Sequence, residues 1–435
     1  MLKSAIAALL LTAGPAIAQT APTPVTVIHA GALLDQPGKP PRGPSTIIVR
    51  DGKVVEVRDG FAAAEGGATL VDLKDRFVLP GLIDMHVHLL GIGGDPMRAR
   101  LTALNTEPAD DMMYGAGNAR ATLMAGFTTV RELGSDPRGI RALRDAVERG
   151  DVDGPTIVNA GTAISVTGGH GDPVNGLAEP YAHAVAATVE NTCDGPDDCR
   201  RATRRQIGLG AQVVKITATG GVLSNVSGGL GRAFTADEMR AIVDTAHGLG
   251  RKVAAHAHAA DGVVGALEAG VDSIEHGSFL DDRAIALLKK SGAYLVPTEI
   301  APVAALAQAR SGALPPATIP KAEAAAAAMV DSHRRAYRAG VKFAFGTDTG
   351  VSKHGRNAEE FALLVNQIGM TPAVAIRTAT VDAADLLGRA DLGAIRPGMT
   401  ADIIAVQGSP LEDVTRLERV TFVMHRGRVA KAVGR

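Results

Sequence analysis

A series of eight short apolar runs, separated by stretches with helical periodicity, limits the fold of this 435-residue chain more than any other feature. Such alternation is typical of repeated βα units, which build a parallel sheet. Two helical stretches carry clear start signals, a Thr235–Glu238 capping box and Thr371 followed by Pro372. Eight such strands predict an α/β fold with a (β/α)8 TIM-like barrel. The predicted strands are residues 81–88, 127–133, 155–161, 212–218, 252–258, 272–277, 293–298 and 342–348.

The two flanks of the barrel have a different pattern. Residues 25–78 contain short alternating strands with an Asp51-Gly52 hairpin turn, and the residues from about 393 onward look similar. Each flank is too short to close a core alone, so we expect the two to combine into one small β-sandwich. The predicted organisation places residues 19–80 and 391–435 in this sandwich and residues 81–390 in the barrel.

The first 18 residues have the composition of a secretory signal peptide. Lys3 supplies the positive charge, and the apolar stretch that follows ends in Ala16-Ile17-Ala18, a typical cleavage site. This stretch is too short to span a bilayer, and no later segment reads as a transmembrane helix. We therefore expect a signal peptide at residues 1–18, export to a bacterial periplasm, and no membrane insertion after its removal.

The composition limits the classes of partner that the chain can bind and indicates the redox state of its two cysteines. Lys and Arg number 45 against 46 Asp and Glu, and no basic cluster stands out, so we expect no nucleic-acid partner. Cys193 and Cys199 flank a Gly-Pro turn, which in an oxidising compartment favours a local disulfide over free thiols. A metal half-site is disfavoured because the spacing is not CxxC and no histidine is close in sequence.

Titratable side chains gather at the ends of the predicted strands. His86 and His88 end the first strand, and residues i and i+2 of a strand point to the same face, which suits them to grip a metal ion. In a (β/α)8 barrel all strand ends meet at one rim, which carries the active site. Because so many such residues share this rim, the sequence predicts a metal centre there. The further candidates are Lys215, His256, His258, His276 and Asp348.

Several motifs together resemble the amidohydrolase superfamily: "PGLIDMHVH", a lysine in the fourth strand, "HAH", "IEHG", "GTD" and "GAIRPGMTADI". The spacing is most similar to a branch with prolidase-type dipeptidases, lysine/arginine carboxypeptidases and ochratoxinase-like amidases. This resemblance implies two divalent metal ions, with Zn²⁺ the best match to neutral imidazoles and hard oxygens. It implies that one ion is held by His86, His88 and Asp348, the second by His256 and His276, with Lys215, carboxylated by CO₂, bridging them.

Two further histidines have roles that the residues alone leave open. His258 shares a strand face with His256, so strand geometry cannot choose between them; the resemblance favours His256 as the ligand and His258 as a substrate-binding or supporting group. His170 lies in the glycine-rich stretch "SVTGGHGDP" after the third strand, and the resemblance implies that it polarises the scissile carbonyl. We interpret the remaining histidines as surface or structural residues: His29, His183, His247, His333, His354 and His425.

The resemblance implies hydrolysis of an amide bond by a metal-bridging hydroxide, with Asp348 moving the proton. We expect a homo-oligomer that acts on dipeptides or N-acyl amino acids, including ochratoxin-like phenylalanine amides. Small and apolar residues in the loops after the fourth and seventh strands, "TATGGVLSNVSGGLGRAF" and "PTEIAPVAALAQ", favour an apolar substrate group. The alternatives are a mononuclear deaminase, which Lys215 disfavours, a cyclic-amide hydrolase, and a non-catalytic scaffold, which the complete ligand set disfavours.

Overall fold

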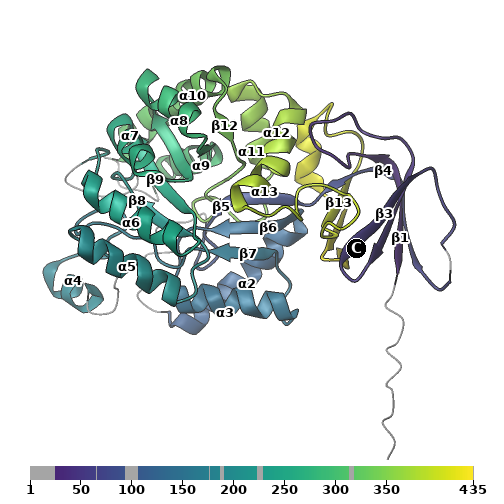
Figure 1. Ribbon diagram of the computed structural model, residues 1–435, viewed down its shortest axis with the longest axis horizontal. Coiled ribbons are helices and arrows are strands. Elements are labelled where there is room, and N and C mark those ends of the chain that lie inside the picture. Colours follow the sequence, from purple (N-terminus) through teal and green to yellow (C-terminus); the bar gives the residue numbers. More distant parts are fainter. Residues whose placement is uncertain are drawn as a thin grey trace, which may run out of the picture.

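In the computed structural model, the described residues are 25–434 except for 65, 94–105, 176, 187–190, 223–228 and 313–317. The predicted signal peptide at residues 1–18 therefore lies outside them. All eight predicted barrel strands are present, and neighbouring strands pair in parallel (Figure 1). They are β5 (Leu82–Val87), β6 (Phe127–Glu132), β7 (Thr156–Asn159), β8 (Val214–Thr217), β9 (Val253–Ala259), β10 (Ser273–Phe279), β11 (Tyr294–Val296) and β12 (Lys342–Phe343).

Main-chain hydrogen bonds close the barrel at its two seams. The Gln212 amide donates to the Asn159 carbonyl at 2.7 Å, which joins the ends of β7 and β8. The Met85 amide donates to the Phe345 carbonyl at 2.9 Å, which joins β5 to the segment after β12. The predicted (β/α)8 barrel is therefore confirmed.

The helices surround this barrel, and both predicted capping motifs are confirmed. The Thr235 hydroxyl accepts a hydrogen bond from the Glu238 amide while the Glu238 carboxylate accepts one from the Thr235 amide. The Thr371 hydroxyl accepts a hydrogen bond from the Val374 amide at 3.3 Å, and Pro372 occupies the first turn of that helix. No described helix is both long and apolar enough to cross a membrane. The helices are α2 (Pro108–Met124), α3 (Pro137–Arg149), α4 (Glu179–Ala186), α5 (Pro196–Gly208), α6 (Ala236–Gly248), α7 (Ala260–Ala269), α8 (Asp282–Ser291), α9 (Ile300–Arg310), α10 (Thr318–Ala339), α11 (Glu359–Leu363), α12 (Pro372–Thr378) and α13 (Val381–Leu387).

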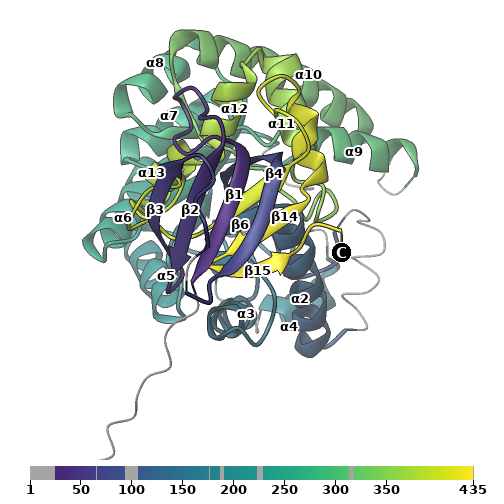
Figure 2. The ribbon, with the colours of Figure 1, turned by 90° about the vertical axis from the view of Figure 1, so that its right-hand side faces the viewer.

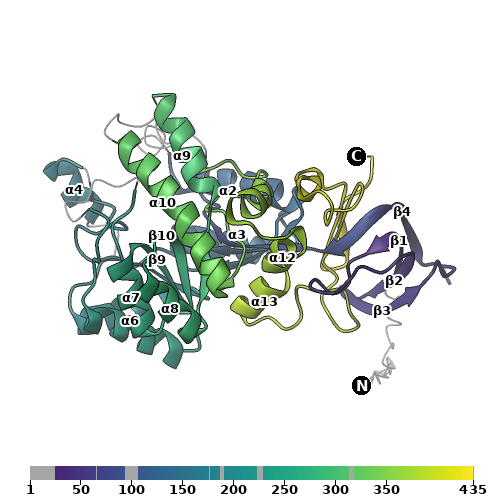
Figure 3. The same ribbon diagram turned by 90° about the horizontal axis from the view of Figure 1, so that it is seen from above.

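One predicted connection differs from the structure. The sequence after the seventh strand was expected to be a loop, but most of it forms helix α9. Its alanine-rich composition explains the difference, because alanine has the highest helix propensity. Helices α9 and α10 run side by side over one end of the barrel (Figure 3).

The two flanks of the chain form one seven-stranded sheet beside the barrel, in the order β15-β14-β13-β4-β1-β2-β3 (Figure 2). Strand β4 joins the flanks, because it pairs in parallel with β1 and antiparallel with β13. Ile28, Ile47, Ile403 and Phe422 come from both flanks and share one apolar core. The strands are β1 (Thr26–Leu33), β2 (Ser45–Arg50), β3 (Lys53–Asp59), β4 (Thr69–Pro80), β13 (Ile403–Val406), β14 (Phe422–His425) and β15 (Arg428–Lys431).

Cys193 and Cys199 are joined in a disulfide, as the sequence favours, with a Cα–Cα distance of 4.9 Å. The segment before this bridge supports the stretch after β7. The Cys193 amide donates to the Ser165 carbonyl at 2.8 Å, and the Asn191 side-chain amide donates to the Gly171 carbonyl at 2.8 Å. The chain at the disulfide is therefore hydrogen-bonded to the loop that carries His170.

Candidate metal centre

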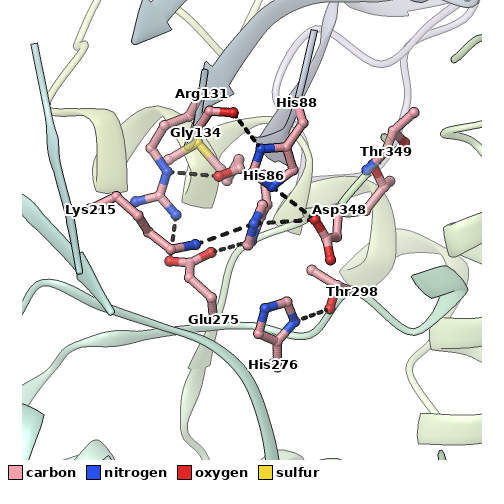
Figure 4. A network of polar contacts seen from close by, with 12 residues as sticks. His86, His88, Arg131, Gly134, Lys215, Glu275, His276, Thr298, Asp348 and Thr349 are labelled. Atoms are coloured by element: carbon pink, nitrogen blue, oxygen red, sulfur yellow. Dashed lines mark hydrogen bonds and ion pairs between the residues drawn. The ribbon is translucent and has the colours of Figure 1, made fainter. Parts of the chain in front are cut away.

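Five of the predicted ligands converge at the carboxyl ends of the barrel strands (Figure 4): His86, His88, Lys215, His276 and Asp348. His86 and His88 end β5 on the same face, and Asp348 Oδ1 lies 3.5 Å from His86 Nε2 and 3.1 Å from His88 Nε2. One potential ligand atom from each of His86, His276 and Asp348 lies within 4.8 Å of the other two. Two imidazoles and a carboxylate this close together form a donor set that fits Zn²⁺.

Lys215 lies among these side chains, on β8. It is buried, and its Nζ is 3.3 Å from His86 Nε2. Burial lowers the pKa of Lys215 to about 8. This favours the uncharged amine, which is the form that can react with CO₂, whereas an ammonium group cannot bind a cation. The position and environment of Lys215 therefore fit a ligand that has been carboxylated.

The imidazole rings form a continuous cluster in the barrel mouth. The ring centroid of His276 lies 5.1 Å from that of His86 and 4.6 Å from that of His256. The ring centroid of His258, also on β9, lies 4.6 Å from that of His256 and 5.1 Å from that of His276. All the predicted histidine ligands are therefore neighbours, and His258 is a neighbour of both second-ion candidates.

Each of these five rings has one nitrogen in contact with an oxygen of the surrounding protein, at 2.8 to 3.4 Å, while the second nitrogen of His86 and of His88 faces Asp348 inside the cluster. This arrangement is typical of metal-binding histidines, whose outer nitrogen is hydrogen-bonded to fix the orientation of the ring. The pairs are His86 Nδ1 with Glu275, His88 Nδ1 with the Gly134 carbonyl, His256 Nε2 with the Gly220 carbonyl, His258 Nδ1 with Ser278 and His276 Nδ1 with Thr298. The hydrogen bonds that orient these rings therefore fit a metal centre, as do the positions of the rings.

The backbone is bent at the strand ends that carry these ligands. His276, Thr298 and Asp348 have φ values of 73°, 57° and 54°, in a left-handed region that such residues rarely occupy. The bend at His276 breaks the alternation of β10, so that Glu275 and its neighbour His276 both approach His86. Backbone strain is thus concentrated where the ligands meet.

Sequence reasoning did not identify two important residues below the centre. Glu275 is fully buried; it accepts hydrogen bonds from His86 Nδ1 at 3.0 Å and from Arg131 Nη2 at 2.7 Å. Burial raises the pKa of Glu275, but Arg131 and His86 lower it more, to about 2. Arg131, also buried, donates to the Met85 carbonyl at 2.7 Å. The available signal was a charged residue inside each of two apolar strands, β6 and β10.

His170 lies at the cavity rather than on the outer surface. Its ring stacks on His256 with centroids 4.4 Å apart, and its Nδ1 is buried with no hydrogen-bond partner among the described residues. Burial lowers the pKa of His170 to about 4. A Cβ at Gly221 would lie 2.3 Å from the ring, so only glycine allows the loop after β8 to approach this closely. Residues 223–228 of that loop lie outside the described part of the chain.

The centre opens into a cavity of about 590 Å³. Apart from the cluster itself, the described lining is mainly apolar, and its sole carboxylate is Asp348. Two helices, α9 and α10, contribute much of the wall. Their lining residues are Ala301, Pro302, Ala305, Gln308, Ala322, Ala325 and Met329, and Leu90, Ile92, Val222 and Val351 add to it.

Comparison with known proteins gives concordant similarities. Residues 77–430 match the model of the amidohydrolase family. The chain is 32% identical over 444 residues to ochratoxinase of Aspergillus niger, covering 96% of this chain and 89% of that protein. It is structurally similar to a Xaa-Pro dipeptidase with bound methionine (TM-score 0.86, 38% identity, 93% of this chain and 99% of that one). It is also similar to a prolidase complexed with N-methylphosphonate-L-proline (TM-score 0.84, 32% identity, 94% and 100% coverage).

The contact between Glu275 and His86 leads to a prediction about metal affinity. The variant Glu275→Gln removes the negative charge that fixes His86 and balances Arg131. We expect apparent metal affinity to fall by roughly 10–100-fold and the free energy of unfolding to fall by about 3 kcal/mol. Chelator competition and chemical denaturation measure the two effects.

The matched control is Glu268→Gln, because Glu268 is exposed and pairs with Arg283 on the surface. An exposed pair of this kind contributes at most about 1 kcal/mol, and its loss leaves metal affinity unchanged. If Glu275→Gln binds metal as tightly as the unmodified protein, Glu275 does not orient a ligand.

Proposed function

The chain belongs to the amidohydrolase family and is a metal-dependent hydrolase of C–N bonds, and from this we propose that it cleaves the amide bond of dipeptides or N-acyl amino acids with an apolar side chain. The observation that carries this proposal is a supported cluster of metal-binding side chains at the floor of an apolar cavity. The similarity to ochratoxinase, to a Xaa-Pro dipeptidase and to a prolidase adds support.

We assign two divalent ions, preferably Zn²⁺, to the cluster. When bound, such ions supply a hydroxide nucleophile at neutral pH and polarise the scissile carbonyl. The clustered imidazole rings and the buried Lys215 support a binuclear centre, because a carboxylated lysine would provide two oxygens for two cations. The assigned ligands are His86, His88 and Asp348 for one ion, His256 and His276 for the other, and Lys215 between them.

Asp348 is the proposed proton carrier. It faces the cavity, and although burial opposes its charge, the nearby imidazoles of His86 and His88 hold the pKa of Asp348 below its ordinary value. The carboxylate can therefore accept the proton that the attacking water loses. Asp348 then returns this proton to the departing amine, which makes the amine a good leaving group.

His170 is proposed to donate a hydrogen bond to the carbonyl oxygen of the substrate. The ring lines the cavity and is fixed from both sides, by His256 and by the close approach of Gly221. A donor fixed in this way stabilises the negative charge that develops on the oxygen during attack. His258 also lines the cavity, and we assign it to substrate binding.

The cavity wall supports the choice of an apolar side chain. Alanine residues on α9 and α10 leave room for a bulky group, and Met329 adds an adaptable apolar surface. A charged side chain placed here would lose its hydration without gaining an ionic partner among the described lining residues. We therefore disfavour the lysine/arginine carboxypeptidase activity found in the same branch. The disulfide supports the further proposal that the protein is exported.

A panel of N-acetyl amino acids tests the substrate proposal directly. We expect kcat/KM for N-acetyl-Phe and N-acetyl-Leu to exceed that for N-acetyl-Lys and N-acetyl-Glu by roughly 100-fold, because an unpaired buried charge costs several kcal/mol. Release of free amino acid is the measurement, and enzyme stripped with a chelator is the control. Preference for the charged substrates, or release of ammonia from amino-substituted rings without amide cleavage, contradicts the proposal.

Lys215→Ala tests the binuclear centre. We expect this variant to lose at least one metal position and nearly all turnover, because no bridging oxygens remain. Elemental analysis and initial rates measure these losses, and millimolar acetate should restore part of the rate by supplying a carboxylate. Lys342→Ala, at an exposed lysine, is the control that should change neither. Full metal content and rate in Lys215→Ala would show that the ligand assignment is wrong.

His170→Ala tests the proposed hydrogen-bond donor. We expect kcat to fall by roughly 10²–10³-fold, the usual loss for one such donor, with metal content unchanged. KM should change little, since the stabilising contact strengthens mainly in the transition state. His183→Ala, at a histidine exposed on α4, is the matched control. A normal kcat with two bound metals would remove His170 from the mechanism.

A further inference from the structure

Two histidines outside the proposed ligand set each hold the main-chain carbonyl of a ligand histidine. His333, on α10, is fully buried; its Nε2 donates to the His276 carbonyl at 2.5 Å, and its Nδ1 contacts Glu299 Oε1 at 2.6 Å. His354, after β12, places its Nε2 2.9 Å from the His88 carbonyl and its Nδ1 3.2 Å from Thr122 Oγ1. The Nε2 atom of each ring thus contacts the main-chain carbonyl of a different ligand histidine.

The ligand at the end of β10 needs such support. His276 has a φ of 73°, so its ring direction depends on a backbone conformation that is unfavourable for a side chain of this size. Such conformations persist where surrounding contacts hold them. His276 is held at two points, by Thr298 at ring Nδ1 and by His333 at the carbonyl. Loss of the carbonyl contact would free the backbone to relax and the ring to turn.

The ligand at the end of β5 is held in a similar way. The His88 amide donates to the Thr349 carbonyl at 2.7 Å, and the His88 ring donates from Nδ1 to the Gly134 carbonyl at 2.9 Å. The His88 carbonyl in turn contacts Nε2 of His354. His354 reaches this position from a turn that packs on α2, where Thr122 lies. The His354 contact therefore ties the barrel rim to a surrounding helix.

The support of His333 extends to the cavity wall. Glu299, which holds His333 Nδ1, lies at the start of α9, and the Glu360 carboxylate accepts hydrogen bonds from the Glu299 and Ile300 amides at 2.9 and 2.7 Å. These residues are all buried. The His276 carbonyl, two wall helices and α11 are thus connected by one series of short hydrogen bonds.

We propose that His333 and His354 are positioning residues that each tighten one metal position: His333 the position that includes His276, and His354 the position that includes His88. This inference rests on the proposed binuclear centre. Neither ring lines the cavity that contains the proposed metal centre. Each therefore acts only through the histidine whose carbonyl it holds. Supporting partners of ligands commonly change metal affinity by 10–100-fold when they are removed.

The test uses His333→Leu and His354→Leu, each serving as the control for the other. Crystals of each variant are equilibrated with limiting Zn²⁺, and anomalous scattering gives the occupancy of each position separately; chelator competition gives the affinities in solution. His29→Leu is the matched remote control, because His29 is also buried and contacts a main-chain carbonyl, that of Ala62, in the flanking sheet. Glutamine variants, which keep a donor N–H near the place of Nε2, provide a gentler change if a leucine variant does not fold.

We expect His333→Leu to weaken the His276 position by roughly 10–100-fold and to leave the His88 position filled, with the reverse for His354→Leu and partial recovery in the glutamine variants. Equal loss at both positions in either leucine variant, or unchanged metal affinity in every folded variant of His333 or of His354, would overturn the proposal. So would a lower unfolding temperature without any change in metal affinity, which indicates a purely structural role. An unmodified enzyme that binds fewer than two ions would instead overturn the binuclear centre itself.

Discussion

The hydrogen bond from His86 to the buried carboxylate of Glu275 is the interaction on which the rest of the site depends. His86 Nε2 lies 3.3 Å from Lys215 Nζ and 3.5 Å from Asp348 Oδ1, so the orientation of this ring sets the centre of the cluster. Glu275 can remain charged in the barrel interior only because Arg131 and Ser273 also bind it. An unpaired carboxylate there would be strongly destabilising, since the interior cannot replace its hydration.

The barrel supplies rigidity around that interaction. Asp84, two residues before His86, accepts hydrogen bonds from the Thr347 hydroxyl at 2.7 Å and the Asn357 side chain at 2.8 Å. The first strand is thereby tied to the segment that carries Asp348, at the seam where the barrel closes. Ligands from the two ends of the barrel sequence are therefore held at a common point, which a metal centre requires.

The apolar cavity has a separate structural origin. Strand ends provide the metal-binding floor, whereas helices α9 and α10 provide much of the wall. Changes in these helices can alter the side chain that the enzyme accepts without disturbing the ligands. The hydrogen bonds from Glu299 through His333 to His276 limit this independence, because they join the wall to one ligand.

The sequence by itself determined the order of the strands and the identity of the ligand candidates, because strand alternation and capping motifs are local patterns. His86, His88, Lys215, His256, His276 and Asp348 all appear at the predicted strand positions and meet as that order requires. Only the tertiary structure decided which nitrogen of each ring is held by the surrounding protein and which residues hold it. Glu275 and His86 are 189 residues apart, so their contact exists only when the barrel closes. The same reason applies to His333 and His354, since no local pattern distinguishes them from the other histidines interpreted as surface or structural residues.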